Sequence, residues 1–325
     1  MKYAVALPQS ARVGSTAAIH DAAQAAEELG FWAVSMHDHI VFDGGWLLCG
    51  AEEDDGQSDR RTVFEHLTTF AYVAGITSRI RLLSSVLLLP VRATIVTAKQ
   101  IATLDQLSGG RVVLGVGVGL SGTDRDPRHV ALLSRNASVE LAALKVPITR
   151  RGQLADEQLA AFQQIWTQDV ASYHGKHVNF DDVQIFPKPA QPGGPPIYIG
   201  GASPAALRRV AEGGYTWLPG HCTPEEIAGG LDALAQLNGN HGQECALDLF
   251  FSMTTTKARP TALEKSFGDQ LPLRNLVGTP DYVTERIRLY RDAGATTLEL
   301  KPVYRNVDEY IQLLETFMKE VAPAV

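Results

Sequence analysis

Cysteine is scarce in this sequence, and no two cysteines lie close together. The three cysteines are Cys49, Cys222 and Cys245, and none belongs to a CxxC pair. This spacing disfavours a structural zinc site and favours a reducing compartment, so we expect a cytoplasmic protein. Long apolar runs are also missing. Val86–Val91 is far shorter than a membrane span, and the apolar run before Pro8 is too short for a signal sequence, so no membrane association is expected.

Basic clusters and low-complexity segments are absent as well. The net charge is −7 and the pI is about 5.7, which argues against nucleic acid as a partner. One acidic run, Glu52–Asp55, is interpreted as solvated surface. The chain has 325 residues, of which 45% are apolar, and this is enough for a large folded core.

Short apolar runs alternate with amphipathic segments along the chain. In the clearest example an apolar run, Ile80–Leu89, precedes a helical pattern over Thr94–Leu107, and a second apolar run follows Gly109 and Gly110. Two buried parallel strands joined by a helix produce this pattern.

Further units of a strand followed by a helix are predicted on both sides of this stretch. The expected strands are Tyr3–Leu7, Ala33–Met36, Ile197–Ile199, Thr216–Leu218, Ala246–Thr254 and Thr297–Leu300. The expected helices are Thr16–Leu29, Thr62–Thr77, Gln153–Thr167, Pro204–Glu212, Pro224–Leu237, Pro280–Ala293 and Val307–Val321. Eight such units predict an α/β protein with one domain over residues 1–325, a single (β/α)8 TIM barrel.

Three segments are longer than ordinary connections. Polar insertions are expected at about 43–61 and 120–152, the second irregular throughout, and a small hairpin or extended excursion is expected at about 171–195. The first two follow strands, and a barrel of this kind carries its active site at the carboxyl ends of its strands. We therefore expect these two insertions to cover that site.

Several motifs resemble the central signature of the bacterial luciferase-like monooxygenase family. They are Pro90, the run AKQIATLDQLSGGR at Ala98–Arg111, and LGVGVG at Leu114–Gly119. The resemblance continues downstream and covers most of the chain. It implies a (β/α)8 barrel that uses FMN or the deazaflavin coenzyme F420. It also implies a homodimer formed through barrel helices, and a separate reductase that supplies reduced cofactor.

Two histidines flank an aspartate directly after the strand Ala33–Met36. Histidine suits proton transfer near neutral pH, and a neighbouring carboxylate can orient it. His37 and His39 also form an HxH pair, as in some metal sites, although no third ligand has a suggestive spacing. A histidine satisfied within a loop is a further interpretation. In F420-dependent members of the family a DH pair ends this strand, which implies that His39 gives or takes a proton and that Asp38 contacts the cofactor.

The third strand ends at Ser85 and Val86. By itself this is an ordinary buried strand end. The resemblance implies a cis peptide bond between these two residues, which backs the deazaflavin ring. Only an atomic structure can show such a bond, because sequence does not distinguish cis from trans at a bond without proline.

The fourth strand ends in glycines that match GxGxxG. The motif comprises Gly117, Val118, Gly119 and, at its end, Gly122. A dinucleotide site would require a helix to begin at once, and the following residues begin a helix poorly. We interpret the small residues as space for a flavin-like ring near the backbone. Some F420-dependent dehydrogenases have a glutamate directly after this motif's second glycine, where this chain has Leu120, so an apolar pocket is expected instead.

The fifth strand leads into a glycine turn at the start of a predicted helix. Backbone N–H groups at such a turn can bind phosphate, and Ser203 followed by proline is equally typical of an ordinary helix cap. The resemblance assigns the cofactor phosphate to this turn, formed by Gly200, Gly201, Ala202 and Ser203. Trp217 after the next strand is expected either to flank the same phosphate or to pack in the core.

The substrate side is predicted less sharply. Phe42 and Trp46 follow the Asp-His pair and, with Leu120, suggest a pocket for a partly apolar molecule. His221 and Cys222 lie on a strand-end loop, but no partner spacing indicates a nucleophilic pair.

The favoured function is F420-dependent hydride transfer to or from a small organic substrate. One alternative is a two-component monooxygenase that uses reduced FMN and O2, since it shares nearly every motif. A second alternative is a flavin-binding protein without turnover. Neither the substrate nor the direction of hydride transfer can be predicted from the sequence.

Overall fold

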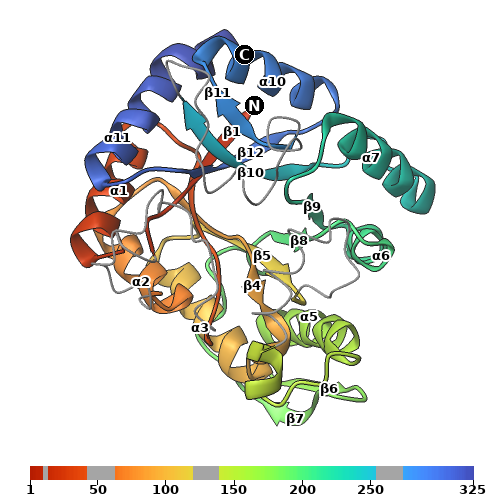
Figure 1. Cartoon of the computed structure of the whole chain (residues 1–325). Coiled ribbons are helices and arrows are strands. Elements are labelled where there is room, and N and C mark those ends of the chain that lie inside the picture. The colour runs from red at the N-terminus through yellow and green to blue at the C-terminus, as the bar shows by residue number, and fades with distance from the viewer. Residues whose placement is uncertain (10–13, 42–62, 120–138, 254–273) are drawn as a thin grey trace.

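The structure is a computed structural model that describes residues 1–9, 14–41, 63–119, 139–253 and 274–325. Most of its strands form one parallel sheet, which curls so that helices lie outside it (Figure 1). The strands of this sheet are β1 (Lys2–Ala6), β2 (Ala33–Met36), β3 (Arg81–Ser84), β4 (Leu87–Leu88), β5 (Val112–Gly117), β8 (Ile197–Gly200), β9 (Thr216–Leu218), β10 (Ala246–Met253), β11 (Leu276–Gly278) and β12 (Thr297–Pro302).

The order of the strands in space is β11-β10-β12-β1-β2-β3-β5-β8-β9, and β4 also pairs with β5. β1 therefore lies between the last strand and the second one, and Ala4 is paired in register with both Glu299 and Ala33. The result is an α/β fold with a curled parallel sheet. The strands form one continuous ladder from β11 to β9, and this ladder does not by itself show the predicted closure into an eight-stranded barrel.

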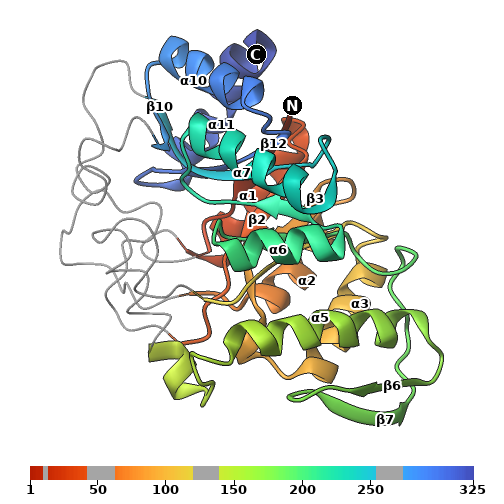
Figure 2. The ribbon, with the colours of Figure 1, turned by 90° about the vertical axis from the view of Figure 1, so that its right-hand side faces the viewer.

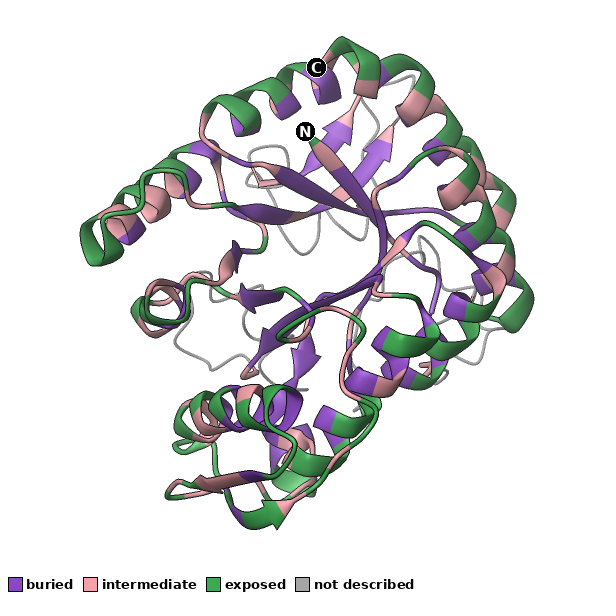
Figure 3. Ribbon diagram, turned by 180° about the vertical axis from the view of Figure 1, so that it is seen from behind, coloured by how far each residue is buried: buried purple, intermediate pink, exposed green. Residues whose placement is uncertain are grey.

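Helices follow most of the strands and cover the outer face of the sheet. They are α1 (Thr16–Glu28), α2 (His66–Ile76), α3 (Thr94–Leu107), α5 (Arg151–Thr167), α6 (Pro204–Gly213), α7 (Pro224–Asn238), α10 (Pro280–Asp292) and α11 (Val307–Thr316). Viewed from behind, the strands are mostly buried and the helices expose their outer sides (Figure 3). None of the helices in the described ranges is long and apolar enough to cross a membrane.

The predicted excursion at 171–195 contains an antiparallel hairpin, β6 (Ala171–His174) and β7 (Asn179–Val183). The hairpin lies beside α5 at the edge of the molecule, away from the large sheet (Figure 2). It is therefore an accessory to the outer helix layer.

Two apolar layers occupy the two faces of the sheet. The larger cluster joins strand residues to helix residues and fills the space between sheet and helices. The smaller cluster consists of strand residues from the inner face: Ala4, Ala33, Leu83, Val113, Tyr198, Leu218 and Ala246. Because side chains alternate along a strand, the next inward positions toward the carboxyl ends are two residues further on. These positions include Ser35, Ser85 and Asp248, so a polar layer lies above the apolar one.

Several element boundaries match the predictions and others differ. β2, β9 and α3 have the predicted bounds. α2 begins at His66 rather than Thr62, because the side chain of Glu65 caps it by accepting from the Thr68 N–H at 2.7 Å.

Two elements were not expected. The short strand β11 pairs with the outer end of β10. The expectation of an irregular segment through about residue 151 is wrong for residues 139–143, which are helical, and right for residues 144–150, which form turns before α5. The remainder of both predicted insertions, at 42–62 and 120–138, lies outside the described residues.

Candidate functional site

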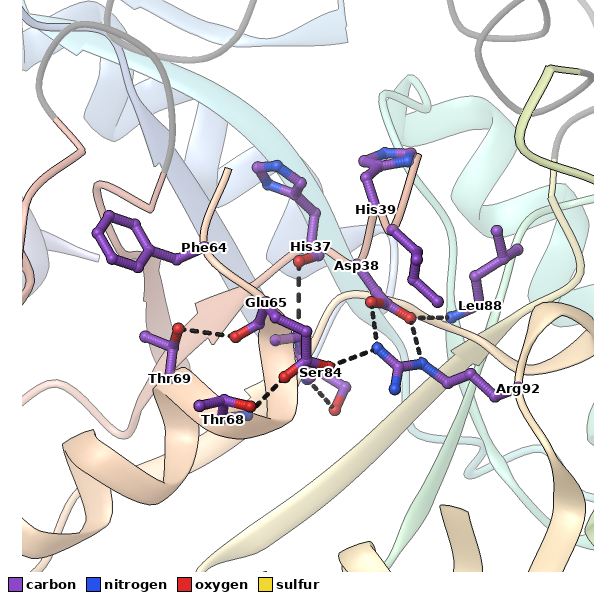
Figure 4. A network of polar contacts seen from close by, with 12 residues as sticks. His37, Asp38, His39, Phe64, Glu65, Thr68, Thr69, Ser84, Leu88 and Arg92 are labelled. Atoms are coloured by element: carbon purple, nitrogen blue, oxygen red, sulfur yellow. Dashed lines mark hydrogen bonds and ion pairs between the residues drawn. The ribbon is translucent and has the colours of Figure 1, made fainter. Parts of the chain in front are cut away.

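The segment after β2 presents its side chains to alternate sides. In Figure 4 the rings of His37 and His39 point to one side, and the carboxylate of Asp38 points to the other, toward Arg92. The two rings are 5.5 Å apart, measured between their centroids. The strand end therefore separates a histidine side from a carboxylate side.

Asp38 is buried in a two-pronged ion pair with Arg92. The guanidinium donates from Nε to Oδ2 at 2.8 Å and from a terminal nitrogen to Oδ1 at 2.6 Å. The Leu88 N–H donates to the same carboxylate at 3.0 Å. This charge thus ties β2 to the segment after β3, and the predicted contact between Asp38 and the cofactor stays a prediction.

Arg92 also reaches Glu65 at the start of α2, at 2.8 Å. Burial of Glu65 acts to raise its pKa, but hydrogen bonds from Thr68 and Arg92 outweigh it and lower this pKa to about 2. Burial likewise opposes the charge of Arg92, and Asp38 more than offsets it, raising the pKa of the guanidinium above its usual value. Glu65 and Arg92 are therefore both charged at neutral pH.

His39 has a carboxylate partner that the sequence did not indicate. Its Nδ1 lies 3.2 Å from Oε2 of Glu140, whose side chain is fully buried. The other carboxylate oxygen accepts from the N–H groups of Ile40 at 2.5 Å and Val41 at 3.1 Å. Glu140 therefore holds both the ring and the backbone of the histidine segment. A ring fixed in this way can carry a proton at a defined place.

The backbone of His37 is held by the side chain of Gln9, which follows β1. The Gln9 amide donates to the His37 carbonyl at 2.8 Å and accepts from the His37 N–H at 2.9 Å. Burial, with smaller effects of His39 and Lys301, keeps the pKa of His37 well below its usual value. His37 is therefore neutral at pH 7.

Beneath the histidines, the polar layer inside the sheet contains a buried acid. Glu299 of β12 accepts from the Ser35 hydroxyl at 2.6 Å and from the Ser85 hydroxyl. Lys301, two residues further along the strand, is paired with Asp248 of β10. The layer thus joins both neighbours of the central strand β1.

Val86 forms a contact surface between two strand ends. The Ser85–Val86 peptide bond is cis, as the resemblance implied. A side chain at Gly117 would meet Val86 Cγ2 at 2.5 Å, and one at Gly200 would meet Cγ1 at 2.9 Å. Both glycines therefore make room for Val86, whereas the sequence interpretation gave space for a ring as the reason at Gly117 and phosphate binding as the reason at Gly200. Val118 and Gly119 follow directly, half-buried, at the end of β5.

The turn after β8 lies at the start of α6. Ser203 caps the helix by accepting from the Ala206 N–H at 3.3 Å, and proline follows it, as predicted. Gly201 is exposed and has a φ of 99°, which favours glycine. Trp217 is buried and donates from its indole to the Gly201 carbonyl at 2.8 Å. It therefore supports the turn from the core side.

The match to a family model decides what this arrangement belongs to. Residues 2–266 match the model described as luciferase-like monooxygenase. The chain belongs to the luciferase-like monooxygenase family. Relatives that this chain matches are named as a monooxygenase and as a dehydrogenase.

Relatives in the family have different cofactors in their names. An uncharacterised protein of Mycobacterium tuberculosis is 30% identical over 208 residues, 63% of this chain and 66% of the relative. The F420-dependent glucose-6-phosphate dehydrogenase of Nakamurella multipartita is 32% identical over 200 residues, 60% of this chain and 50% of the relative. The FMNH2-dependent dimethylsulfone monooxygenase of Pseudomonas putida is 32% identical over 188 residues, 57% of this chain and 43% of the relative. The matches span two thirds or less of these relatives, and they leave a flavin and a deazaflavin both plausible.

The fold agrees with that of a solved structure along the whole chain. An F420-dependent secondary alcohol dehydrogenase in complex with an F420–acetone adduct has a TM-score of 0.77 and 16% identity, and the match covers 100% of this chain and 99% of that one. At this identity the likeness shows the fold alone.

The structure does not describe the predicted substrate-pocket residues. Phe42, Trp46 and Leu120 lie outside the described residues. In the described ranges no group of three or more His, Cys, Asp or Glu side chains could hold a metal ion. His221 contacts Asn275 through Nδ1 at 2.9 Å, and its Nε2 lies 3.7 Å from Asp248 of β10.

Sequence reasoning missed Arg92, Glu140 and Glu299. Glu299 had a visible signal, because an acid within the apolar run of a buried strand requires a partner. Arg92 had a weaker one, since it follows the family motif at Pro90. Glu140 had none, because its partner His39 is 101 residues away.

Proposed function

We propose that this luciferase-like protein is an F420-dependent oxidoreductase that transfers a hydride between the deazaflavin and a small, partly apolar organic substrate. The observation that carries the proposal is the contact between His39 and Glu140. A histidine at a strand end, oriented by a buried carboxylate, suits the transfer of the proton that accompanies a hydride. The DH pair at this position favours F420 among the family's cofactors.

The described residues fit an elongated cofactor. The Val86 side chain occupies the space that a Cβ at Gly117 or at Gly200 would need, so it lies between the ends of β5 and β8, next to the cis peptide. When bound, the deazaflavin would supply hydride chemistry. Ser85, Val86, Gly117, Val118 and Gly119 would support its ring. The turn Gly200–Ser203 would offer backbone N–H groups to its phosphate, with Trp217 supporting that turn.

We also infer that the curled sheet closes into the (β/α)8 barrel. Two isolated parallel bridges support closure between β9 and β10, Trp217 with Cys245 and Gly220 with Asp248. In a closed barrel the strand ends converge on one mouth, which would hold His39 and the cofactor together. A homodimer, a cytoplasmic location and a separate reductase are further parts of the proposal.

The first test is anaerobic titration of the protein with F420 and with FMN, each oxidised and reduced, followed by fluorescence or calorimetry. Micromolar affinity for F420 with negligible affinity for FMN is the expected result. Tight binding of reduced FMN alone would contradict the choice of cofactor.

The second candidate function is a monooxygenase that uses reduced FMN and O2. It is supported by the relative from Pseudomonas putida, whose name specifies reduced FMN. Oxygen consumption that depends on reduced FMN and an organic substrate would favour it over the proposal.

A His39→Gln variant separates either enzyme from a flavin-binding protein without turnover. If His39 handles a proton, the variant keeps its affinity for the cofactor and loses turnover by roughly 10²–10⁴-fold, the usual contribution of a general acid or base. His241→Gln, at a solvent-exposed histidine, is the matched control and should retain activity. Unchanged turnover in the His39 variant would remove His39 from the reaction.

A further inference from the structure

The strongest candidate outside the roles assigned above is the buried carboxyl group of Glu299. The residue is 1% exposed, and its two carboxylate oxygens accept from Ser35 on β2 and from Ser85, directly after β3. Among the described residues, no cation lies within ion-pair distance of it. A buried acid with hydroxyl partners and no paired cation is poorly suited to a permanent charge.

The hydrogen-bonding partners suit both charge states of this acid. Serine hydroxyls donate or accept by rotation. When Glu299 is ionised, both hydroxyls donate to it. When it is protonated, its own O–H can donate to one hydroxyl while its other oxygen still accepts. Neither state leaves a carboxyl oxygen without a partner, so the site can gain or lose a proton without rearrangement of the fold.

The groups around Glu299 are placed so that its charge depends on its surroundings. Lys301 on the same strand favours ionisation, and Asp248 on β10 opposes it. His37, directly after β2, is neutral, and β1 contributes Ala4 at the position paired with Glu299. Burial is the largest effect and raises the pKa of Glu299 to about 7. A further negative charge nearby would therefore change its protonation under ordinary conditions.

Ser85 links this acid to the surface assigned to the cofactor ring. Its hydroxyl contacts Glu299, and its carbonyl belongs to the peptide bond shared with Val86. We propose that Glu299 is a proton-binding site behind this surface, which takes up a proton from solvent when an anionic cofactor binds over Ser85 and Val86. The step forms one O–H bond on the carboxyl group and consumes one buffer proton. The inference rests on the proposed cofactor function.

Calorimetry can count the protons. F420 and FMN are each titrated into the protein between pH 5.5 and 8, at each pH in two phosphate-free buffers that buffer there and differ in ionisation enthalpy. Because Glu299 is about half ionised at pH 7, the wild type should take up about half a proton more than Glu299→Gln there. The difference should vanish toward pH 5.5, where the acid is already protonated. Glu285→Gln, at an exposed position, should behave as the wild type.

A folded Glu299→Gln variant that binds with the same proton count as the wild type at every pH would overturn the proposal. Ser35→Ala gives a second comparison that keeps the acid. It removes a hydrogen bond that favours ionisation of Glu299, so the pKa of Glu299 should rise. The pH at which the extra proton uptake on cofactor binding reaches half of its maximum should rise with it.

Infrared difference spectra of the cofactor-free protein separate this inference from the proposed function. A protonated carboxyl band should disappear as the pH rises through about 7 and should be absent in Glu299→Gln. If neither cofactor binds, the proposed function and uptake on binding both fail, and the infrared band still decides whether Glu299 holds a proton. A carboxylate that is ionised throughout this range would overturn the proton site itself.

Discussion

Replacing Arg92 with methionine tests whether the ion pair with Asp38 holds the carboxyl end of β2 in place. The side chains of Asp38 and Arg92 are 1% and 8% exposed, so the substitution leaves a buried carboxylate without its cation. Removing one partner of such a pair costs roughly 3–5 kcal/mol. Asp38 keeps the hydrogen bond from Leu88, which favours the lower end, about 3 kcal/mol. At about 2 °C per kcal/mol for a chain of this size, Tm should fall by about 6 °C.

Arg208→Met is the matched control for this substitution. Arg208 and Glu212 form a pair of 3.8 Å on α6, with side chains 57% and 72% exposed. Exposed pairs of this kind contribute about 0.5 kcal/mol or less. Both variants are measured by thermal and urea unfolding at pH 7, followed by tryptophan fluorescence. If Arg92→Met is no less stable than Arg208→Met, the ion pair between Asp38 and Arg92 does not stabilise the end of β2.

The pH dependence of stability and a double-mutant cycle test the ion pairs of Arg92 independently. The pKa of Glu65 is about 2 in the folded protein, below its ordinary value of 4.5, so its stabilising contribution is complete above about pH 4.5 and is lost as the pH falls toward 2. The stability gap between wild type and Arg92→Met should narrow in the same direction. Asp38→Asn combined with Arg92→Met should cost less than the two single changes together, and strict additivity would refute direct coupling.

The other predictions concern the cofactor surface and the two buried acids. Gly117→Ala should destabilise the protein by about 1–3 kcal/mol and weaken cofactor binding, because the added methyl meets a side chain at 2.5 Å, whereas Gly229→Ala in open space on α7 should be neutral or stabilising. Glu140→Gln should switch the neutral tautomer of His39, read by nitrogen-15 NMR, because the new amide donates where the carboxylate accepted; an unchanged tautomer would contradict the contact. The pKa of Glu299 is about 7 in the folded protein and 4.5 as its ordinary value, so the wild type should lose stability as the pH rises from 5 to 8. Over this range the free energy of unfolding of Glu299→Gln should therefore rise by about 2–3 kcal/mol relative to that of the wild type, and parallel curves of stability against pH would exclude the raised pKa.

Local signals account for the elements that the sequence predicted well. α6 begins at Ser203 and Pro204 and ends at a glycine in the left-handed conformation, and each of these residues marks a helix end by its own chemistry. β2 has its predicted bounds because its apolar residues stop abruptly at His37. The short strand β11 was missed because a strand of three residues has too few positions to show a pattern.

The contacts of the site were beyond sequence reasoning because they join distant parts of the chain. Arg92 meets Asp38 across 54 positions, and Glu140 meets His39 across 101. The sequence nominated His39 through its place after a strand, which is a local property. It could not nominate the carboxylate that orients the ring, since only the folded chain brings residues 139–143 to the strand end.

Strand alternation explains why the three residues of the HDH segment differ in role. Ser35 points inward to Glu299, and His37 and His39, two and four residues further on, point to one side of the segment, while Asp38 points to the other, toward Arg92. Asp38 therefore acts on the histidines through the backbone that it anchors, and the carboxylate that contacts the ring of His39 is Glu140 instead. A single apolar substitution at Asp38 should thus displace the whole segment, whereas one at Glu140 should free the ring and the two N–H groups that it holds.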